Sequence, residues 1–158
     1  MYRTSNTLSE NILFKSAEVL NRHLAAAIDL HAPVKQAHWN VRGPAFIAIH
    51  ELLDEVADVV DSYSDTIAER AAALGSTAEG TIQAAVKRSF LEQYELGVAD
   101  QEAHLAAVTA ALAVFGDSAP KAIDEAAAFG DQDTSDVFTE VSRGVDYQTW
   151  LVESHLHL

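Results

Sequence analysis

Two pairs of side chains that can bind metal lie on one predicted helix of this 158-residue chain. His50 and Asp54 are four residues apart, and Asp65 and Glu69 repeat that spacing after a gap of eleven residues. Residues four apart are neighbours on a helix, so each pair can face the same ion. His38 lies upstream of both pairs. A mixed set of imidazole and carboxylate donors suits iron, and suits zinc or manganese less selectively.

The two pairs are too far apart to bind one ion within a single straight helix. The gap between Asp54 and Asp65 spans about 16 Å at ~1.5 Å per residue, whereas a metal–ligand bond is only about 2 Å long. The four side chains and Asp61 nevertheless share a sector of roughly 100° on the helix. If two copies packed antiparallel, His50 and Asp54 of one would face the Asp65 and Glu69 positions of the other.

Such a contact would be symmetric, with its two-fold axis near Val59 and Val60 and with two equivalent sites. The site centres, near positions 52 and 67, would lie roughly 22 Å apart. We therefore predict a metal site that one copy of the chain cannot complete.

The element that must position these residues is a long helix over residues 45–74. This stretch has no Pro or Gly, and its apolar residues recur at helical spacing. Pro44 suits the helix start, and Gly75 suits its end. A first helix is expected over residues 8–40, with a kink at Pro33.

Two more long helices are expected over residues 91–129 and 134–155, and a short helix over residues 81–88. Gly116 and Pro120 interrupt the third long pattern, so the sequence also allows two helices there. Long helices with short or crossover connections predict an all-α, four-helix bundle of ferritin-like type.

Composition supports this fold class and limits the compartment. Ala is abundant, and strand-like alternation is absent. The chain has no Cys, so disulfides and thiolate metal sites are excluded. No apolar run approaches the ~20 residues that span a bilayer, and the first fourteen residues do not resemble a signal peptide. We expect one domain over residues 1–158, located in the cytoplasm.

Residues 35–81, KQAHWNVRGPAFIAIHELLDEVADVVDSYSDTIAERAAALGSTAEGT, resemble the Dps family of mini-ferritins. The segments AHWN and SDTIAER and the His50–Asp54 pair match its ferroxidase motif, and DVFTEVSRGVDYQTWLVES continues the resemblance. It implies one long third helix and a short helix in the long crossover between the second and third helices. It also implies a dodecamer that oxidises Fe²⁺, with hydrogen peroxide as the favoured oxidant, and stores Fe³⁺ mineral.

The resemblance divides the five ligands between two subunits. In the family that this chain resembles, one subunit provides the counterparts of His38, His50 and Asp54. The subunit related to it by the two-fold axis provides those of Asp65 and Glu69. The indole of Trp39 directly follows a ligand. Core packing is the ordinary role of such a ring, but it could also donate an electron when iron chemistry generates radicals.

A second acidic set consists of Asp131, Asp136 and Glu140. The resemblance places acids at these positions along a pore at a three-fold axis, where three copies would attract Fe²⁺. The alternative is that acids such as Asp131 and Asp133 complement the dipole at the start of the last helix.

The remaining histidines receive no functional assignment. His23, His31 and His104 are interpreted as surface or core residues. His155 and His157 diverge by about 200° on a helix, so they cannot chelate one ion unless the chain end is extended.

Charge argues against direct DNA binding. The formal net charge is −14, whereas affinity for DNA depends on cationic groups that neutralise phosphates. Arg3 is the sole Lys or Arg among the first fourteen residues, and the last fifteen contain none. The alternative function, a DNA-compacting structural protein with secondary iron chemistry, would need such basic tails. A di-iron enzyme with its site inside one bundle would use Glu-x-x-His motifs, which the chain lacks.

Overall fold

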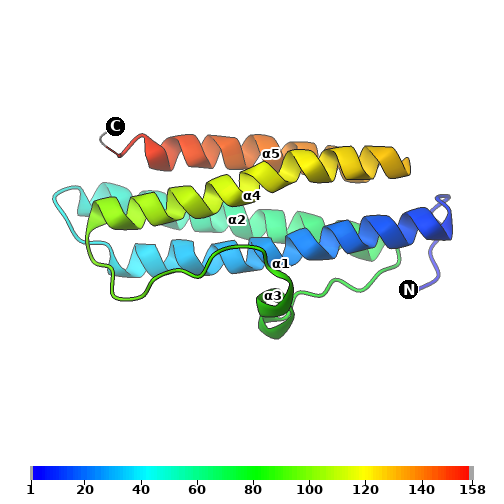
Figure 1. Ribbon diagram of the computed structural model, residues 1–158, viewed down its shortest axis with the longest axis horizontal. Coiled ribbons are helices and arrows are strands. Elements are labelled where there is room, and N and C mark those ends of the chain that lie inside the picture. The colour runs from blue at the N-terminus through cyan, green and yellow to red at the C-terminus, as the bar shows by residue number, and fades with distance from the viewer. Residues whose placement is uncertain (1, 157–158) are drawn as a thin grey trace.

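Five helices form the fold in the computed structural model, which describes residues 2–156 (Figure 1). The long helices are α1 (Glu10–Asn40), α2 (Phe46–Ala73), α4 (Gln101–Phe129) and α5 (Gln132–Glu153), and the short helix is α3 (Ile82–Arg88). Helix α1 packs along α2, α4 packs along α5, and contacts of α1 with α4 and of α2 with α5 join the two pairs. The predicted all-α four-helix bundle is therefore confirmed.

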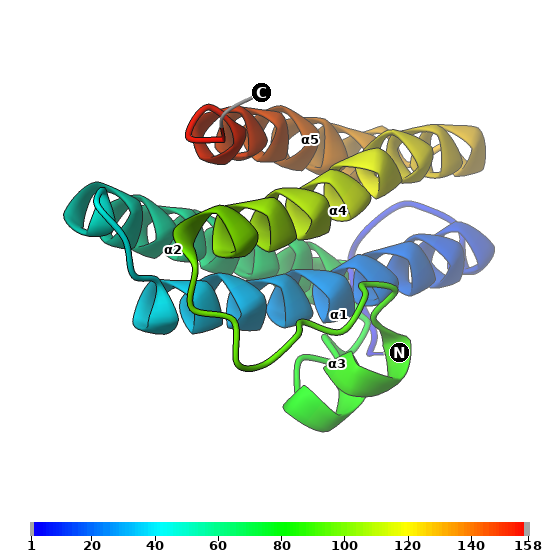
Figure 2. The same ribbon diagram turned by 60° about the vertical axis from the view of Figure 1, so that its left-hand side comes forward.

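The short helix α3 lies outside the bundle and packs against α1 (Figures 1 and 2). It belongs to the long crossover that leads from the end of α2 to the start of α4. Arg88 forms ion pairs with Glu18 of α1 and with Glu79. The short helix that was expected in the crossover is confirmed.

Branched and aromatic apolar side chains fill the space between the four long helices. The largest fully buried ones come from every long helix: Leu20, Leu24, Leu30, Ile49, Leu53, Ile67, Leu105, Leu112, Phe115 and Phe138. Burial of a side chain of this size stabilises the fold by about 1.5–3 kcal/mol before the entropy cost of folding is subtracted. This core fixes the long helices relative to one another, and with them the side chains at their ends.

Prolines do not break the long helices. Helix α1 runs through Pro33, and α4 is one helix through Gly116 and Pro120. Each proline removes one backbone donor, but packing of the flanking apolar residues holds the helix together. Of the two arrangements that the sequence allowed for the third long element, the single helix is the one observed.

The start of α4 differs from the expected residue 91. The helix begins at Gln101, where Asp100 caps it by accepting a hydrogen bond from the Ala103 N–H at 3.1 Å. Residues 91–100 are an irregular crossover with a turn at residues 96–97, and Gly97 in this turn has a φ of +88°, a conformation that favours glycine. The Arg42 N–H donates to the Ala99 carbonyl at 3.2 Å, which ties the turn between α1 and α2 to the start of α4.

Candidate metal site

Two histidines at the junction of α1 and α2 hold each other in place. His38 lies in the last turn of α1, and His50 lies in the first turns of α2. Their rings stack with centroids 3.8 Å apart and planes inclined by 18°. The Nδ1 atom of each ring is 2.8 Å from the backbone carbonyl oxygen of the other residue.

These reciprocal hydrogen bonds determine the tautomer of both rings. A carbonyl oxygen only accepts, so each Nδ1 must carry the proton and donate it. In the neutral form of each ring, the lone pair is then on Nε2, which is the arrangement that a metal-binding histidine needs. His38 Nε2 lies 3.8 Å from Oδ1 of Asp54, so a carboxylate oxygen lies beside an imidazole nitrogen. The structure thus brings together three of the five predicted ligands.

Lys35 is a member of this cluster that the sequence analysis did not identify. Its Nζ hydrogen-bonds to Oδ1 of Asp54 and lies 5.9 Å from the centre of the Trp39 ring. The hydrogen bond from Lys35 is the main cause that lowers the pKa of Asp54, with smaller contributions from the nearby histidines. The available signal was spacing, because Lys35 precedes His38 by three residues and therefore shares its helix face.

The second predicted pair stays apart from the first. Asp65 and Glu69 are exposed on the later turns of α2, as is Asp61. Within residues 2–156 of one chain, no group of three or more His, Asp or Glu side chains has the geometry to hold a metal ion. Three ligands therefore cluster loosely at one end of α2, and two further carboxylates face solvent near the other.

Trp39 does not pack into the core of its own chain. Its side chain is 67 % exposed, although it directly follows the buried His38. The core-packing interpretation therefore fails within one chain. The exposed indole lies next to Lys35, whose Nζ is 5.9 Å from the ring centre.

The acidic set on α5 divides into one buried and two exposed members. Asp131 is 1 % exposed and caps α5 by accepting from the Thr134 N–H at 3.1 Å and the Thr134 hydroxyl at 2.6 Å. Arg70 of α2 donates to it at 2.7 Å. Asp136 and Glu140 are exposed on the same helix.

Opposing effects act on the pKa of Asp131. Burial raises it, but the hydrogen bonds from Thr134 and the charge of Arg70 together outweigh burial and leave the pKa below its ordinary value. Both carboxylate oxygens are engaged within the chain, so Asp131 acts as a helix cap here. This geometry matches the helix-start alternative for Asp131, and it leaves Asp136 and Glu140 as the carboxylates that could line a pore.

The chain end and the helix surfaces add two observations. Nδ1 of the exposed His155 lies 2.9 Å from the Leu151 carbonyl oxygen, and His157 falls outside the described residues. None of the helices within residues 2–156 combines the length and apolarity that a membrane span requires.

Comparison with known proteins relates this arrangement to a protein family. The ferritin-like domain family matches residues 17–158. The DNA protection during starvation protein of Agrobacterium fabrum is 40% identical over 155 residues, which cover 98% of this chain and 96% of that protein. DpsA14 from Streptomyces coelicolor aligns with a TM-score of 0.92 at 36% identity, over 99% of this chain and 92% of that one. Dps from Microbacterium arborescens, solved in a high iron form, has a TM-score of 0.87 at 32% identity, with coverages of 96% and 97%.

Proposed function

Since the chain belongs to the Dps family within the ferritin-like superfamily, we propose that it oxidises Fe²⁺ at sites shared between two copies and stores the Fe³⁺ product inside a hollow dodecamer. The observation that carries this proposal is the pair of interlocked histidines. Their Nε2 atoms are available to a metal, and a carboxylate lies beside them, yet the cluster lacks the donors to complete a site.

A second copy supplies the missing donors. Asp65 and Glu69 are exposed on the same helix as His50 and Asp54, at a distance that one ion cannot bridge. An antiparallel contact between two α2 helices around a two-fold axis brings the two sets together twice. The completed site has two imidazole nitrogens and three carboxylates, and the combined charge of −3 on the carboxylates lies between the +2 of one Fe²⁺ ion and the +4 of two.

The shared site can pass electrons in pairs. Two Fe²⁺ ions that lose one electron each reduce one hydrogen peroxide molecule to two water molecules, with the uptake of two protons. Asp54 of one copy, with Asp65 and Glu69 of the other, could bridge the two irons. Paired transfer avoids the hydroxyl radical that a single Fe²⁺ would release from peroxide. The exposed indole of Trp39 could donate an electron when a single Fe²⁺ ion reacts with peroxide and releases a radical.

Iron uptake uses the exposed acids of α5. Three copies of Asp136 and Glu140 around a three-fold axis would form a negative pore that raises the local Fe²⁺ concentration. Asp131 holds the start of the same helix through its hydrogen bonds to Thr134 and Arg70. We assign it to the support of the pore, because its oxygens are already engaged.

Protection of DNA is chemical in this proposal. The net charge of −14 per chain opposes contact with phosphates, so removal of iron and peroxide replaces physical coating. The site of action is the cytoplasm, where the particle would act near the nucleoid without binding duplex DNA directly.

The test mixes two inactive variants. One carries His50→Ala and Asp54→Ala, and the other carries Asp65→Ala and Glu69→Ala. Each alone should assemble but lose rapid Fe²⁺ oxidation, by at least the ~10–100-fold that weaker perturbations of metal sites cost. After unfolding and refolding together, mixed dimers should regain one intact site, because each chain keeps the half that the other lost.

The initial rate of Fe³⁺ formation after peroxide addition measures recovery. Each variant refolded alone is the control, and size-exclusion chromatography checks assembly. A mixture as inactive as its components would refute sharing between copies. Unchanged oxidation by the single variants would refute the ligand assignment itself.

A further inference from the structure

A phenol and an imidazole form an internal pair that the proposed iron chemistry does not use. Tyr94 lies in the crossover between α3 and α4, and His104 lies in the first turns of α4. The Tyr94 hydroxyl is 2.5 Å from Nδ1 of His104, and the two rings are within 12° of parallel. His104 is 1 % exposed, and its Nε2 has no hydrogen-bond partner among residues 2–156.

Both members are in the protonation state that favours proton transfer from phenol to imidazole. Burial raises the pKa of Tyr94 to about 12, so the phenol keeps its proton at neutral pH. Burial lowers the pKa of His104, so the imidazole is neutral and can accept a proton. The backbone carbonyls of Val98 and Asn40 lie near the ring without making a well-formed hydrogen bond to Nε2. These carbonyls and the charge of Asp100 raise the pKa of His104, so they would stabilise the imidazolium once it forms.

Packing alone does not explain this pair. A phenylalanine would fill the space of Tyr94, and an apolar side chain at position 104 would avoid a buried nitrogen without a partner. Such an unpartnered group costs roughly 1–3 kcal/mol, and its presence in a folded protein calls for an explanation. A need for a proton acceptor next to the Tyr94 phenol would explain why an imidazole is buried at position 104.

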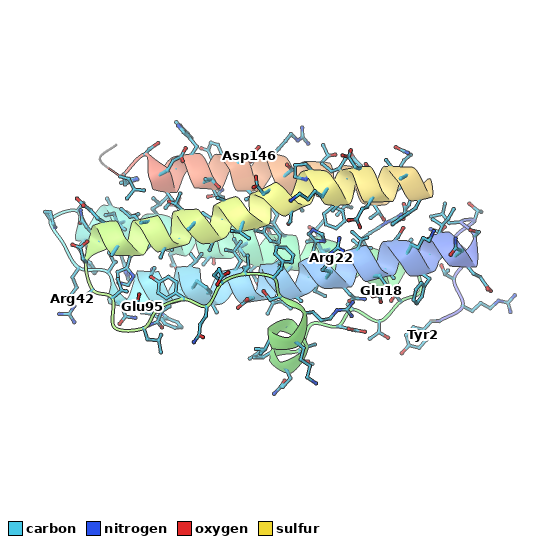
Figure 3. All side chains as sticks on the ribbon, viewed as in Figure 1. Tyr2, Glu18, Arg22, Arg42, Glu95 and Asp146 are labelled. Atoms are coloured by element: carbon cyan, nitrogen blue, oxygen red, sulfur yellow. The ribbon has the colours of Figure 1, made fainter. Side chains whose placement is uncertain are left out.

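The Tyr94–His104 pair lies on the same side of the molecule as the exposed indole of Trp39. Trp39 and Tyr94 line one groove of about 770 Å³, together with Lys35 and Gln36. Lys35 in turn contacts Asp54 of the metal cluster. Figure 3 shows Glu95, the neighbour of Tyr94, at the same end of the bundle as Arg42, which follows α1. Oxidants formed at the cluster therefore arise close to this groove.

We propose that Tyr94 and His104 form a proton-coupled redox site that removes one-electron oxidants by way of Trp39. The inference rests on the proposed function for its oxidant, the hydroxyl radical from a single Fe²⁺ and hydrogen peroxide. The radical takes one electron from Trp39 and one proton from solvent, and becomes water. Tyr94 then returns an electron to the indole, its O–H bond breaks, and the proton moves to Nδ1 of His104. A neutral tyrosyl radical and an imidazolium remain.

The test generates the oxidant without iron. Azide radicals, produced by pulse radiolysis in iron-free assembled protein, oxidise tryptophan by one electron. In the wild type, the tryptophanyl signal should decay as a tyrosyl signal rises, and freeze-quench electron paramagnetic resonance should detect the product. Tyr94→Phe should reduce the tyrosyl yield several-fold. All of these proteins carry Trp150→Phe, because exposed Trp150 is a second target of the azide radical and its ring centroid lies 5.7 Å from that of Tyr147. In this background the matched control Tyr147→Phe removes an exposed tyrosine of α5 and should change the yield little.

His104 acts as the proton acceptor, so its test must separate proton transfer from packing. Tyrosyl formation should be slower in D₂O for the wild type, because the phenolic proton moves with the electron. His104→Phe should keep tryptophan oxidation but reduce tyrosyl formation several-fold. An equal tyrosyl yield in Tyr94→Phe and wild type would overturn the proposal, as would the absence of any isotope effect.

Spin trapping on the unmodified protein keeps the proposal testable if these variants fold poorly. Adducts should map to the peptide that contains Tyr94, and adducts confined to Tyr2 and Tyr147 would refute it. The ferroxidase-deficient His50→Ala, Asp54→Ala variant should give the same iron-free result as wild type. Failure of the proposed iron chemistry is therefore distinguishable from failure of this inference.

Discussion

Asp54 and Asp131 are both carboxylates that accept hydrogen bonds from a basic side chain, but their surroundings differ. The Asp54 side chain is 50% exposed and bound to Lys35, whereas the Asp131 side chain is 1% exposed and bound to Arg70. Asp131 also accepts from Thr134 and caps a helix. An exposed carboxylate can exchange its ammonium partner for a metal ion at little cost, whereas a buried one would leave a guanidinium unpaired.

The largest difference between the two acids should appear in stability. Asp131→Ala removes the cap of α5 and leaves Arg70, which is 14% exposed, without its buried partner. Loss of one member of a buried ion pair costs about 3–5 kcal/mol in the free energy of unfolding. Asp54→Ala should change the free energy of unfolding little, because exposed pairs contribute little. Urea unfolding midpoints at equal protein concentration measure the stability of both variants. Similar midpoints would show that burial does not make Asp131 more important for stability than Asp54.

The exchange of Lys35 for a metal ion should appear in affinity. Lys35→Gln removes the ammonium group that competes for Asp54, so Co²⁺ or Zn²⁺ should bind to the assembled protein more tightly, by roughly 2- to 5-fold. Isothermal titration calorimetry measures this change, and Lys87→Gln on the exposed face of α3 is the matched control. Weaker binding in Lys35→Gln would show instead that the ammonium group orients Asp54 for the metal.

The exposed acids of α5 should affect the rate of iron uptake and not the chemistry of oxidation. Asp136→Asn combined with Glu140→Gln should slow the appearance of iron inside the particle a few-fold at low salt. The difference should shrink at high salt, where screening already weakens attraction at a distance. Stopped-flow measurement gives the rate of iron uptake. The matched control is Asp117→Asn combined with Asp124→Asn, which removes two exposed acids of α4. Equal uptake rates for the α5 variant and the wild type at low salt would show that Asp136 and Glu140 do not attract iron to a pore.

The smallest effect is the response of Asp131 to acid. Its pKa is lower in the folded state than in the unfolded state, so its contribution to stability is complete above the unfolded pKa. That contribution is lost as the pH falls through the folded pKa. Asp131→Asn should therefore lower stability near neutral pH but flatten the loss of stability below about pH 4. Acid titrations of both proteins, followed by far-ultraviolet circular dichroism, should show a smaller slope for the variant.

Helical periodicity was sufficient to predict the bundle, but it misplaced one boundary. The apolar residues Leu91, Tyr94 and Val98 continue a helix-like pattern through the crossover, so the third long helix was expected to start ten residues too early. Gly97 lies in a turn with a left-handed φ that a right-handed helix cannot contain, and Asp100 caps the helix that begins after it. Pro120 does not end the helix, although the sequence allowed a break there, because the packed surface of α4 maintains the helix through it.

The candidate site was predictable where it depends on spacing within one helix. His50 and Asp54 follow such a spacing, and the structure places them beside His38. The hydrogen bonds between the two histidines join residues twelve apart across a turn, and no local pattern indicates them. The Tyr94–His104 pair depends on the path of the crossover in the same way, so His104 received no role from the sequence. The assignment of Asp65 and Glu69 to a neighbouring copy stays a prediction.

The reciprocal bonds of His38 and His50 make the site tolerant to mutation in an unusual manner. The hydrogen bond that orients each imidazole is accepted by the other residue's main chain, although the two rings also stack on each other. A substitution at either position deletes one ring but leaves the carbonyl that orients the surviving one. Each ligand can therefore be lost without loss of the hydrogen bond that orients the other, and an evolving lineage could replace one donor while the second keeps this bond.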